Sequence, residues 1–168
     1  MHTPASIAGH PIHPMIVPVA IGGFILSFVF DIVGLASGQG APWAATAYYT
    51  MIGGIVGALL AAVPGLIDLL SLPSGETKKI ALTHMGINLT VVALYVVNAW
   101  LRYGNPENAT FPILLSFIAL CMLVASGWLG GKMVFEAGVG VNPSSSAPSA
   151  SSRISSGDQA STHGLRSH

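Results

Sequence analysis

Two histidines in the stretch GHPIHPM, residues 9–15, are the first candidates for chemistry in this chain. His10 and His13 are each followed directly by a proline. Because a residue before proline is disfavoured in helical geometry, both histidines are predicted to be extended, with His13 just ahead of a helix that begins at Pro14. In an extended segment three residues span about 9 Å, so the two imidazoles cannot easily chelate one small ion together. We therefore expect one of them to pair with an imidazole from elsewhere in the chain.

Three further polar residues fall near the ends of apolar segments. Asp68 closes the second segment, and His84 lies one turn into the third. Asn88 follows His84 by four residues, so the two side chains project from one helix face. An even number of membrane crossings brings the start of the first segment, the end of the second and the start of the third to one membrane face. His10, His13, Asp68 and His84 are therefore expected to share that face.

The residue types in this group fit three kinds of chemistry. In the first, His10, His13 and His84 are ligands to haem b or a transition metal, and Asp68 joins the metal site or orients a ligand. In the second, the same groups relay protons or gate a small solute. In the third, they satisfy one another structurally at the membrane edge. A haem- or metal-binding module in membrane electron transfer is the leading hypothesis. A transporter or channel component, and a structural membrane subunit, are its alternatives.

Asp31 lies far from this group. It is 17 residues past Pro14, which is roughly 25 Å along a helix at about 1.5 Å per residue. Asn98 falls near the same end. Because ionisable groups inside apolar segments are costly, each raises a functional question. For Asp31, an interfacial position and a pore or proton role are predicted with about equal weight.

Four apolar segments must position these residues. They run over Pro14–Ala36, Ala44–Leu70, Ile80–Leu101 and Pro112–Phe135, and each approaches or exceeds the roughly 20 residues needed to cross the hydrocarbon core. The runs are continuous rather than alternating, which favours helices over a β-barrel. Of the 168 residues, 52% are hydrophobic and only 7% are charged, whereas soluble domains carry roughly a quarter. The predicted fold is an all-α, four-helix transmembrane bundle.

The predicted domain boundaries follow from composition. Residues 1–13 form an N-terminal arm, residues 14–140 the transmembrane domain, and residues 141–168 a Ser-rich tail predicted to be disordered. His163 and His168 lie in that tail and are expected to be solvated. In the second segment, the spacing of Gly53 and Gly57 lets two backbones approach closely. This pattern is compatible with a homo-oligomer seam or, more simply, with packing inside one bundle.

Charge predicts the orientation. One side of the bundle would hold five cations, Lys78, Lys79, Lys132, Arg153 and Arg166, whereas the other would hold only Arg102. Because positive loops favour the cytoplasm, both termini are predicted to be cytoplasmic in a bacterial inner membrane. The first segment is expected to remain as a membrane helix, since no Lys or Arg precedes it as in a signal peptide.

Composition also excludes several classes of function. Only 6 Lys and Arg are present and the net charge is +0, so a nucleic-acid partner is not expected. Cys121 is the only cysteine, which rules out an intrachain disulfide and a cysteine metal cluster. No serine or cysteine nucleophile stands with a histidine in a recognisable motif, so a stand-alone hydrolase is disfavoured and an enzyme is not the favoured interpretation. The lipid bilayer is the expected environment.

The segments GHPIHPMIVPVAIGGFILSFVFDIVG, AAVPGLIDLL, THMGINL and GWLGGKMVFEAGVGV resemble the DUF2231 family of bacterial membrane proteins over roughly residues 9–141. The resemblance implies four membrane helices. Some similar proteins are fused to Rieske-type iron–sulfur domains, which implies a redox neighbourhood and a redox protein partner. No Rieske-like cysteine–histidine pair exists in this chain, so such a partner must be another polypeptide. Similar proteins tend to have a histidine where this chain has Ala137, which removes one potential ligand. The residues at family-like polar positions are His10, Pro11, His13, Pro14, Asp31, Asp68, His84 and Asn88.

Overall fold

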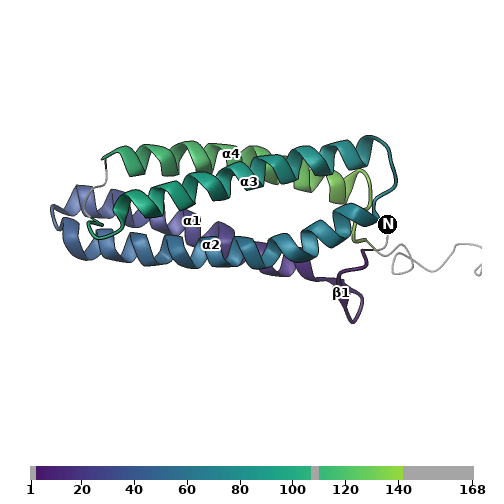
Figure 1. Cartoon of the computed structure of the whole chain (residues 1–168), viewed down its shortest axis with the longest axis horizontal. Coiled ribbons are helices and arrows are strands. Elements are labelled where there is room, and N and C mark those ends of the chain that lie inside the picture. Colours follow the sequence, from purple (N-terminus) through teal and green to yellow (C-terminus); the bar gives the residue numbers. More distant parts are fainter. Residues whose placement is uncertain (1–2, 107–109, 142–168) are drawn as a thin grey trace, which may run out of the picture.

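The computed structural model describes residues 3–106 and 110–141, and it consists of four long helices preceded by a short hairpin (Figure 1). The tail histidines His163 and His168 lie outside the described residues. The strands are β1 (Ser6–Ile7) and β2 (His10–Pro11), and the helices are α1 (Ile12–Ser37), α2 (Gly40–Ser71), α3 (Glu76–Arg102) and α4 (Thr110–Phe135). The chain therefore forms two successive helical hairpins, α1–α2 and α3–α4.

All four helices are long and apolar enough to cross a membrane. The shortest has 26 residues, or roughly 39 Å at about 1.5 Å per residue, against a hydrocarbon core of about 30 Å. Many large apolar side chains remain exposed on the outside of the bundle, Leu70, Val124 and Trp128 among them. In a bilayer these side chains face lipid. The backbone polar groups of each helix need no partner from the lipid, since they are hydrogen-bonded within the helix. The predicted four-helix fold is confirmed.

The arm differs from its prediction. The chain pairs Ser6 with Pro11 and Ile7 with His10 in an antiparallel hairpin, whose turn has positive φ angles at Ala8 and Gly9. The Ile12 amide donates to the Ala5 carbonyl, and α1 begins at Ile12 rather than at Pro14. His10 is extended as predicted, whereas His13 is helical. The first-turn amides of a helix have no intrahelical partner, so Pro14 loses nothing there by lacking one.

Within the first hairpin, α1 and α2 pack closely at glycines. A Cβ atom at Gly23 would lie 2.6 Å from the Gly54 Cα atom, and a Cβ at Gly57 would lie 3.0 Å from Val19. Gly53, by contrast, has open space around it. Gly54 and Gly57 thus serve the packing of α2 against α1.

The core joins the two hairpins at mid-height. Phe24 of α1 and Tyr95 of α3 stack with ring centroids 3.9 Å apart and planes within 4°. Met51, Val91 and Ala119 are buried around them. This stacked pair fixes the position of α1 relative to α3 along the bundle axis. That position determines which polar residues can meet at each end. We call the end that carries the arm, the α2–α3 turn and the end of α4 the arm end, and the other the loop end.

Candidate functional site: paired histidines at the arm end

His13 lies in the first turn of α1 and points at α2. Its Nδ1 atom is 2.8 Å from the carbonyl oxygen of Ala61. The ring lies against Gly65, where a Cβ atom would approach Nδ1 to 2.7 Å, a separation that real Cβ contacts do not show. The absence of a side chain at Gly65 is therefore what admits the imidazole between the two helices.

His84 of α3 has the same relation to α4. Its Nδ1 atom lies 2.9 Å from the carbonyl oxygen of Ser126 and also 2.9 Å from the Ser126 hydroxyl. A Cβ atom at Gly130 would lie 3.4 Å from the His84 Cε1 atom, which is an ordinary van der Waals contact. Each imidazole is thus clamped to the backbone of the second helix of its own hairpin.

These hydrogen bonds fix the chemistry of the free nitrogen. A carbonyl oxygen can only accept, so Nδ1 of each neutral ring carries the proton and Nε2 carries the lone pair. Metal-ligating histidines commonly donate their other N–H to a carbonyl in this way, which sets both tautomer and ring orientation. His13 and His84 are therefore oriented as ligands would be.

Asn88 holds the Nε2 atom of His84. Its amide nitrogen lies 2.8 Å from the His84 carbonyl oxygen, 2.6 Å from the Ser126 hydroxyl and 3.1 Å from His84 Nε2. An amide group has only two N–H donors, so it cannot serve three acceptors at once. The contact to Nε2 is the longest of the three and is the one most easily given up.

The two histidines lie at the same depth of the bundle. His13 lies eleven residues before Phe24, and His84 lies eleven residues before Tyr95. Eleven residues make about three helical turns, so each histidine projects from the same face as its aromatic partner, roughly 16 Å nearer the arm end. Since Phe24 and Tyr95 stack on each other, His13 of α1 and His84 of α3 lie at equal depth in the bundle, each against the second helix of its own hairpin.

The other predicted members of the group lie apart from this pair. His10 is exposed in the hairpin, and its Nδ1 contacts only the nearby Ala8 carbonyl, at 3.1 Å. Asp68 accepts a hydrogen bond from the Ala5 amide at 3.0 Å, so it fastens the arm to α2. Within residues 3–106 and 110–141 no hydrogen bond joins Asp68 to an imidazole. The groups that orient the histidines are backbone carbonyls, which a sequence does not reveal.

The described residues contain no group of three or more His, Cys, Asp or Glu side chains that could hold a metal ion. A bare ion would therefore lack protein ligands. Two imidazoles do meet the needs of a cofactor that brings its own equatorial donors, as haem does.

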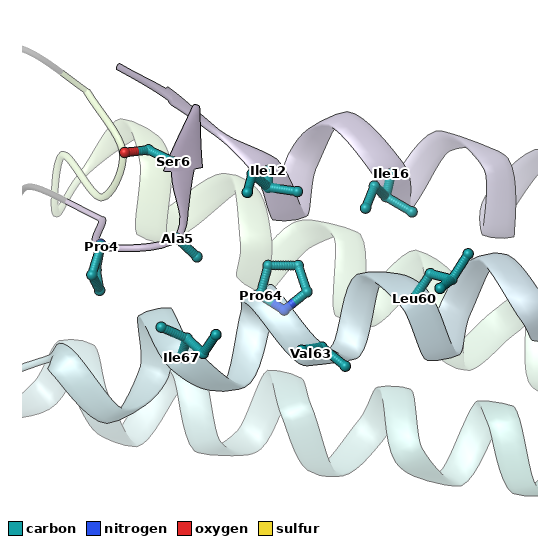
Figure 2. Close-up of a pocket in the computed structure, with 9 residues that line it drawn as sticks. All are labelled: Pro4, Ala5, Ser6, Ile12, Ile16, Leu60, Val63, Pro64 and Ile67. Atoms are coloured by element: carbon teal, nitrogen blue, oxygen red, sulfur yellow. The ribbon is translucent and has the colours of Figure 1, made fainter. Parts of the chain in front are cut away.

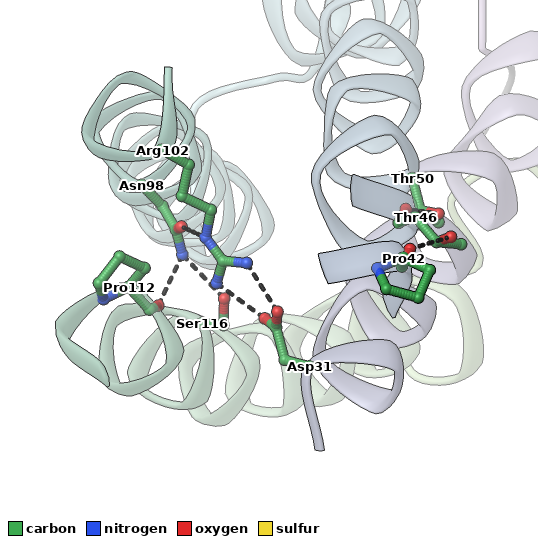
Figure 3. Close-up of polar contacts among 8 residues, drawn as sticks. All are labelled: Asp31, Pro42, Thr46, Thr50, Asn98, Arg102, Pro112 and Ser116. Atoms are coloured by element: carbon green, nitrogen blue, oxygen red, sulfur yellow. Dashed lines mark hydrogen bonds and ion pairs between the residues drawn. The ribbon is translucent and has the colours of Figure 1, made fainter. Parts of the chain in front are cut away.

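The loop end carries a buried ion pair that the sequence analysis missed (Figure 3). Arg102 donates from both terminal nitrogens to the Asp31 carboxylate, at 2.6 and 2.7 Å. Both side chains are at most 1% exposed. Arg102 Nε donates to the Asn98 side-chain oxygen at 2.9 Å, and Asn98 in turn donates to the Pro112 carbonyl and the Ser116 hydroxyl of α4. This network links α1, α3 and α4.

Asp31 is therefore buried within the bundle, and Arg102 is paired with it rather than exposed in the loop. Asp31 and Arg102 each lie seven residues, about two turns, beyond Phe24 and Tyr95. That shared spacing was the available signal. It places both side chains on the inward face of their helices, where only a paired charge is tolerated.

An apolar groove lies between the arm, α1 and α2 (Figure 2). It has a volume of about 480 Å³, and its lining includes Ile12, Ile16, Leu60 and Val63. No charged side chain lines it, and Ser6 is its one polar lining residue among those described. The paired histidines are the better candidate site.

Four helices that are long and apolar enough to cross a membrane define this chain as a polytopic helical membrane protein. The family of predicted membrane proteins named DUF2231 matches residues 9–143, and the chain belongs to that family. No curated protein and no solved structure matches this chain. The resemblance drawn from the sequence is thereby confirmed.

Proposed function

We propose that this protein is a membrane redox module that holds a metal-containing cofactor between His13 and His84. One observation carries the proposal: two imidazoles from different hairpins sit at one depth, each with Nδ1 clamped to a backbone carbonyl and Nε2 left as the lone-pair donor. The cofactor would supply one-electron redox chemistry, and the chain's residues would bind and orient it.

The surroundings support binding rather than catalysis by the side chains. The site lies among apolar helices, where an unpartnered imidazole is costly and a ligated one is stable. The Asp31–Arg102 pair closes the loop end with a fully satisfied ion pair, which argues against a continuous aqueous path for a solute through the bundle. The transporter alternative is therefore the weaker of the two.

The test is the metal content of the full-length protein, purified in mild detergent from cells grown with ample iron and copper. We expect a near-stoichiometric transition metal in the wild type and its loss in His13→Ala and in His84→Ala. His10→Ala is the matched control, because His10 belongs to the same HP-x-HP stretch but is exposed, and it should retain the metal. Each variant is checked for folding by its helical circular dichroism.

Two outcomes would overturn the proposal. One is a folded wild-type protein that carries no transition metal under these conditions. The other is a loss of metal in His10→Ala as large as that in His13→Ala, which would place the ligands in the arm rather than in the bundle.

A further inference from the structure

The two helical hairpins match each other residue by residue, although their sequences do not. Tyr95 follows Phe24 by 71 residues, and Arg102 follows Asp31 by the same 71. His84 follows His13 by 71 as well. Each pair joins a residue of α1 to its counterpart in α3. An offset that holds at three positions along two helices shows that α1 and α3 run parallel and in register.

The second helices repeat each other with their own constant offset. Ala61 and Ser126, whose carbonyls accept from the two histidines, are 65 residues apart. Gly65 and Gly130, which flank the two rings, are separated by the same 65. Burial follows the same rule. The buried residues of α4 are Pro112, Ser116, Ala119 and Ser126, and each lies 65 positions after a buried residue of α2, namely Ala47, Met51, Gly54 and Ala61.

Equivalent residues of the two halves contact each other directly. Phe24 stacks on Tyr95, and Asp31 pairs with Arg102. Two equivalent groups can touch only if the axis that relates them passes between them. The axis therefore runs along the bundle, parallel to the helices, through the stacked rings and the ion pair. Extended toward the arm end, it passes between His13 and His84.

We infer that the chain is an internal duplication of a helix–glycine–helix hairpin, and that its cofactor is a six-coordinate haem whose iron lies on the pseudo-two-fold axis with one imidazole from each half. This inference rests on the proposed function and names its cofactor.

The symmetry and the ligand count together select this class of cofactor. Two equivalent imidazoles, one from each half, match a centre that offers two equivalent coordination positions. With no third protein ligand among the described residues, the other donors must come with the cofactor, as the four pyrrole nitrogens of a porphyrin do. Cys121 is the only cysteine, so two thioether links are not available and the haem would be held without covalent attachment.

Two axial imidazoles leave no open position for oxygen or another small molecule. The predicted chemistry is therefore electron transfer with other one-electron carriers. Asn88 makes the surroundings of the two histidines unequal, since the residue 71 positions before it is Val17. In the haem-free protein its amide satisfies Nε2 of His84, and on binding it would retain its two shorter hydrogen bonds.

The experiment measures haem by the pyridine haemochrome assay, and spin state by electron paramagnetic resonance, on the full-length protein from haem-supplied cells. We expect one non-covalent haem per chain with a low-spin ferric signal. His13→Met and His84→Met should each change the ligand set in the same way and shift the reduced spectrum alike, since the two positions are equivalent. His10→Met, the control, should leave signal and spectrum unchanged.

The outcomes separate this inference from the proposed function. A stoichiometric metal that depends on both histidines but contains no porphyrin would overturn the haem and leave the redox module standing. A high-spin haem that needs only one of the two histidines would overturn the two-fold site. Absence of any cofactor in the folded wild type would overturn the inference and the proposed function together.

Discussion

Replacing Arg102 by leucine should destabilise the bundle more than any exposed substitution. The change leaves the Asp31 carboxylate at most 1% exposed and without the two N–H donors that now lie 2.6 and 2.7 Å away. It also removes the donor to the Asn98 oxygen. Breaking a buried pair by deleting one partner costs about 3–5 kcal/mol, which corresponds to a change of about 10²- to 10⁴-fold in the folding equilibrium constant.

The double variant Asp31→Leu/Arg102→Leu isolates the cause. With both charges gone, no ion is left unpaired, and apolar replacements of a buried pair are often neutral. We expect the double variant to unfold at a higher denaturant fraction than either single variant, with a coupling free energy of at least about 2 kcal/mol. The assay is reversible unfolding in mixed micelles of sodium dodecyl sulfate and a mild detergent, followed by far-ultraviolet circular dichroism.

Lys79→Ala is the control, because it breaks the exposed pair with Glu76 and should change stability by less than about 1 kcal/mol. The reasoning would be refuted if Arg102→Leu behaved like this control. It would equally be refuted if the two single losses simply added in the double variant, because the two charges would then not depend on each other.

The remaining predictions concern the arm end, the packing and the topology. Gly65→Ala should displace the His13 ring, since the new Cβ would meet Nδ1 at 2.7 Å, and should lower the cofactor content at least tenfold. Gly22→Ala is the control, because its Cβ would meet nothing within 4 Å. Equal cofactor content in the two variants would contradict the role of Gly65 in seating the His13 ring. Gly54→Ala should lower the melting temperature by several degrees, because its Cβ would meet the Phe24 ring at 2.8 Å. A melting temperature equal to that of Gly53→Ala would show that the close packing of α1 on Gly54 does not contribute to stability. A reporter active only in the periplasm should be silent when fused after Gly140 and active when inserted after Asn105, and the reverse pattern would invert the predicted orientation. Truncation after Val141 should leave the melting temperature unchanged, given the Ser-rich composition of the tail, and a clear fall would show that the tail packs on the bundle.

The helices could be predicted from sequence because the signal is long and local. Each apolar run is bounded by turn residues such as Gly38, which adopts a positive φ of 66°, and by the Pro73–Gly75 turn. The β1–β2 hairpin, whose turn has two residues, was not predictable in the same way. Its turn places a non-glycine residue, Ala8, at a φ of 51°, a conformation that sequence rules assign to Gly or Asn.

The site could be predicted only in part. Helix ends place His13 and His84 at one depth, and the structure brings their hairpins together there. The orienting partners are the carbonyls of Ala61 and Ser126, and no residue type marks a carbonyl acceptor. Asp68 was the obvious side-chain partner, yet the arm's own Ala5 amide takes its carboxylate.

The repeat was hidden for a similar reason. Over residues 13–33 and 84–104 only two positions are identical, the histidines and Ile16 with Ile87. The core requires side chains of similar shape rather than identical residues, so one half carries Phe24 where the other carries Tyr95. At the ion pair the two halves must carry opposite charges, so identity there is excluded. The repeat is therefore visible in the constant spacing between equivalent residues and not in sequence identity.

The most direct test of the account is a titration of haemin into the cofactor-free, full-length protein in detergent, followed by visible absorbance. The wild type should give a sharp end point at one haemin per chain, with a spectrum typical of two imidazole ligands. The His13→Ala/His84→Ala double variant should show only weak, non-saturating binding. Identical titrations for the wild type and the double variant would contradict the claim that these two histidines form the site.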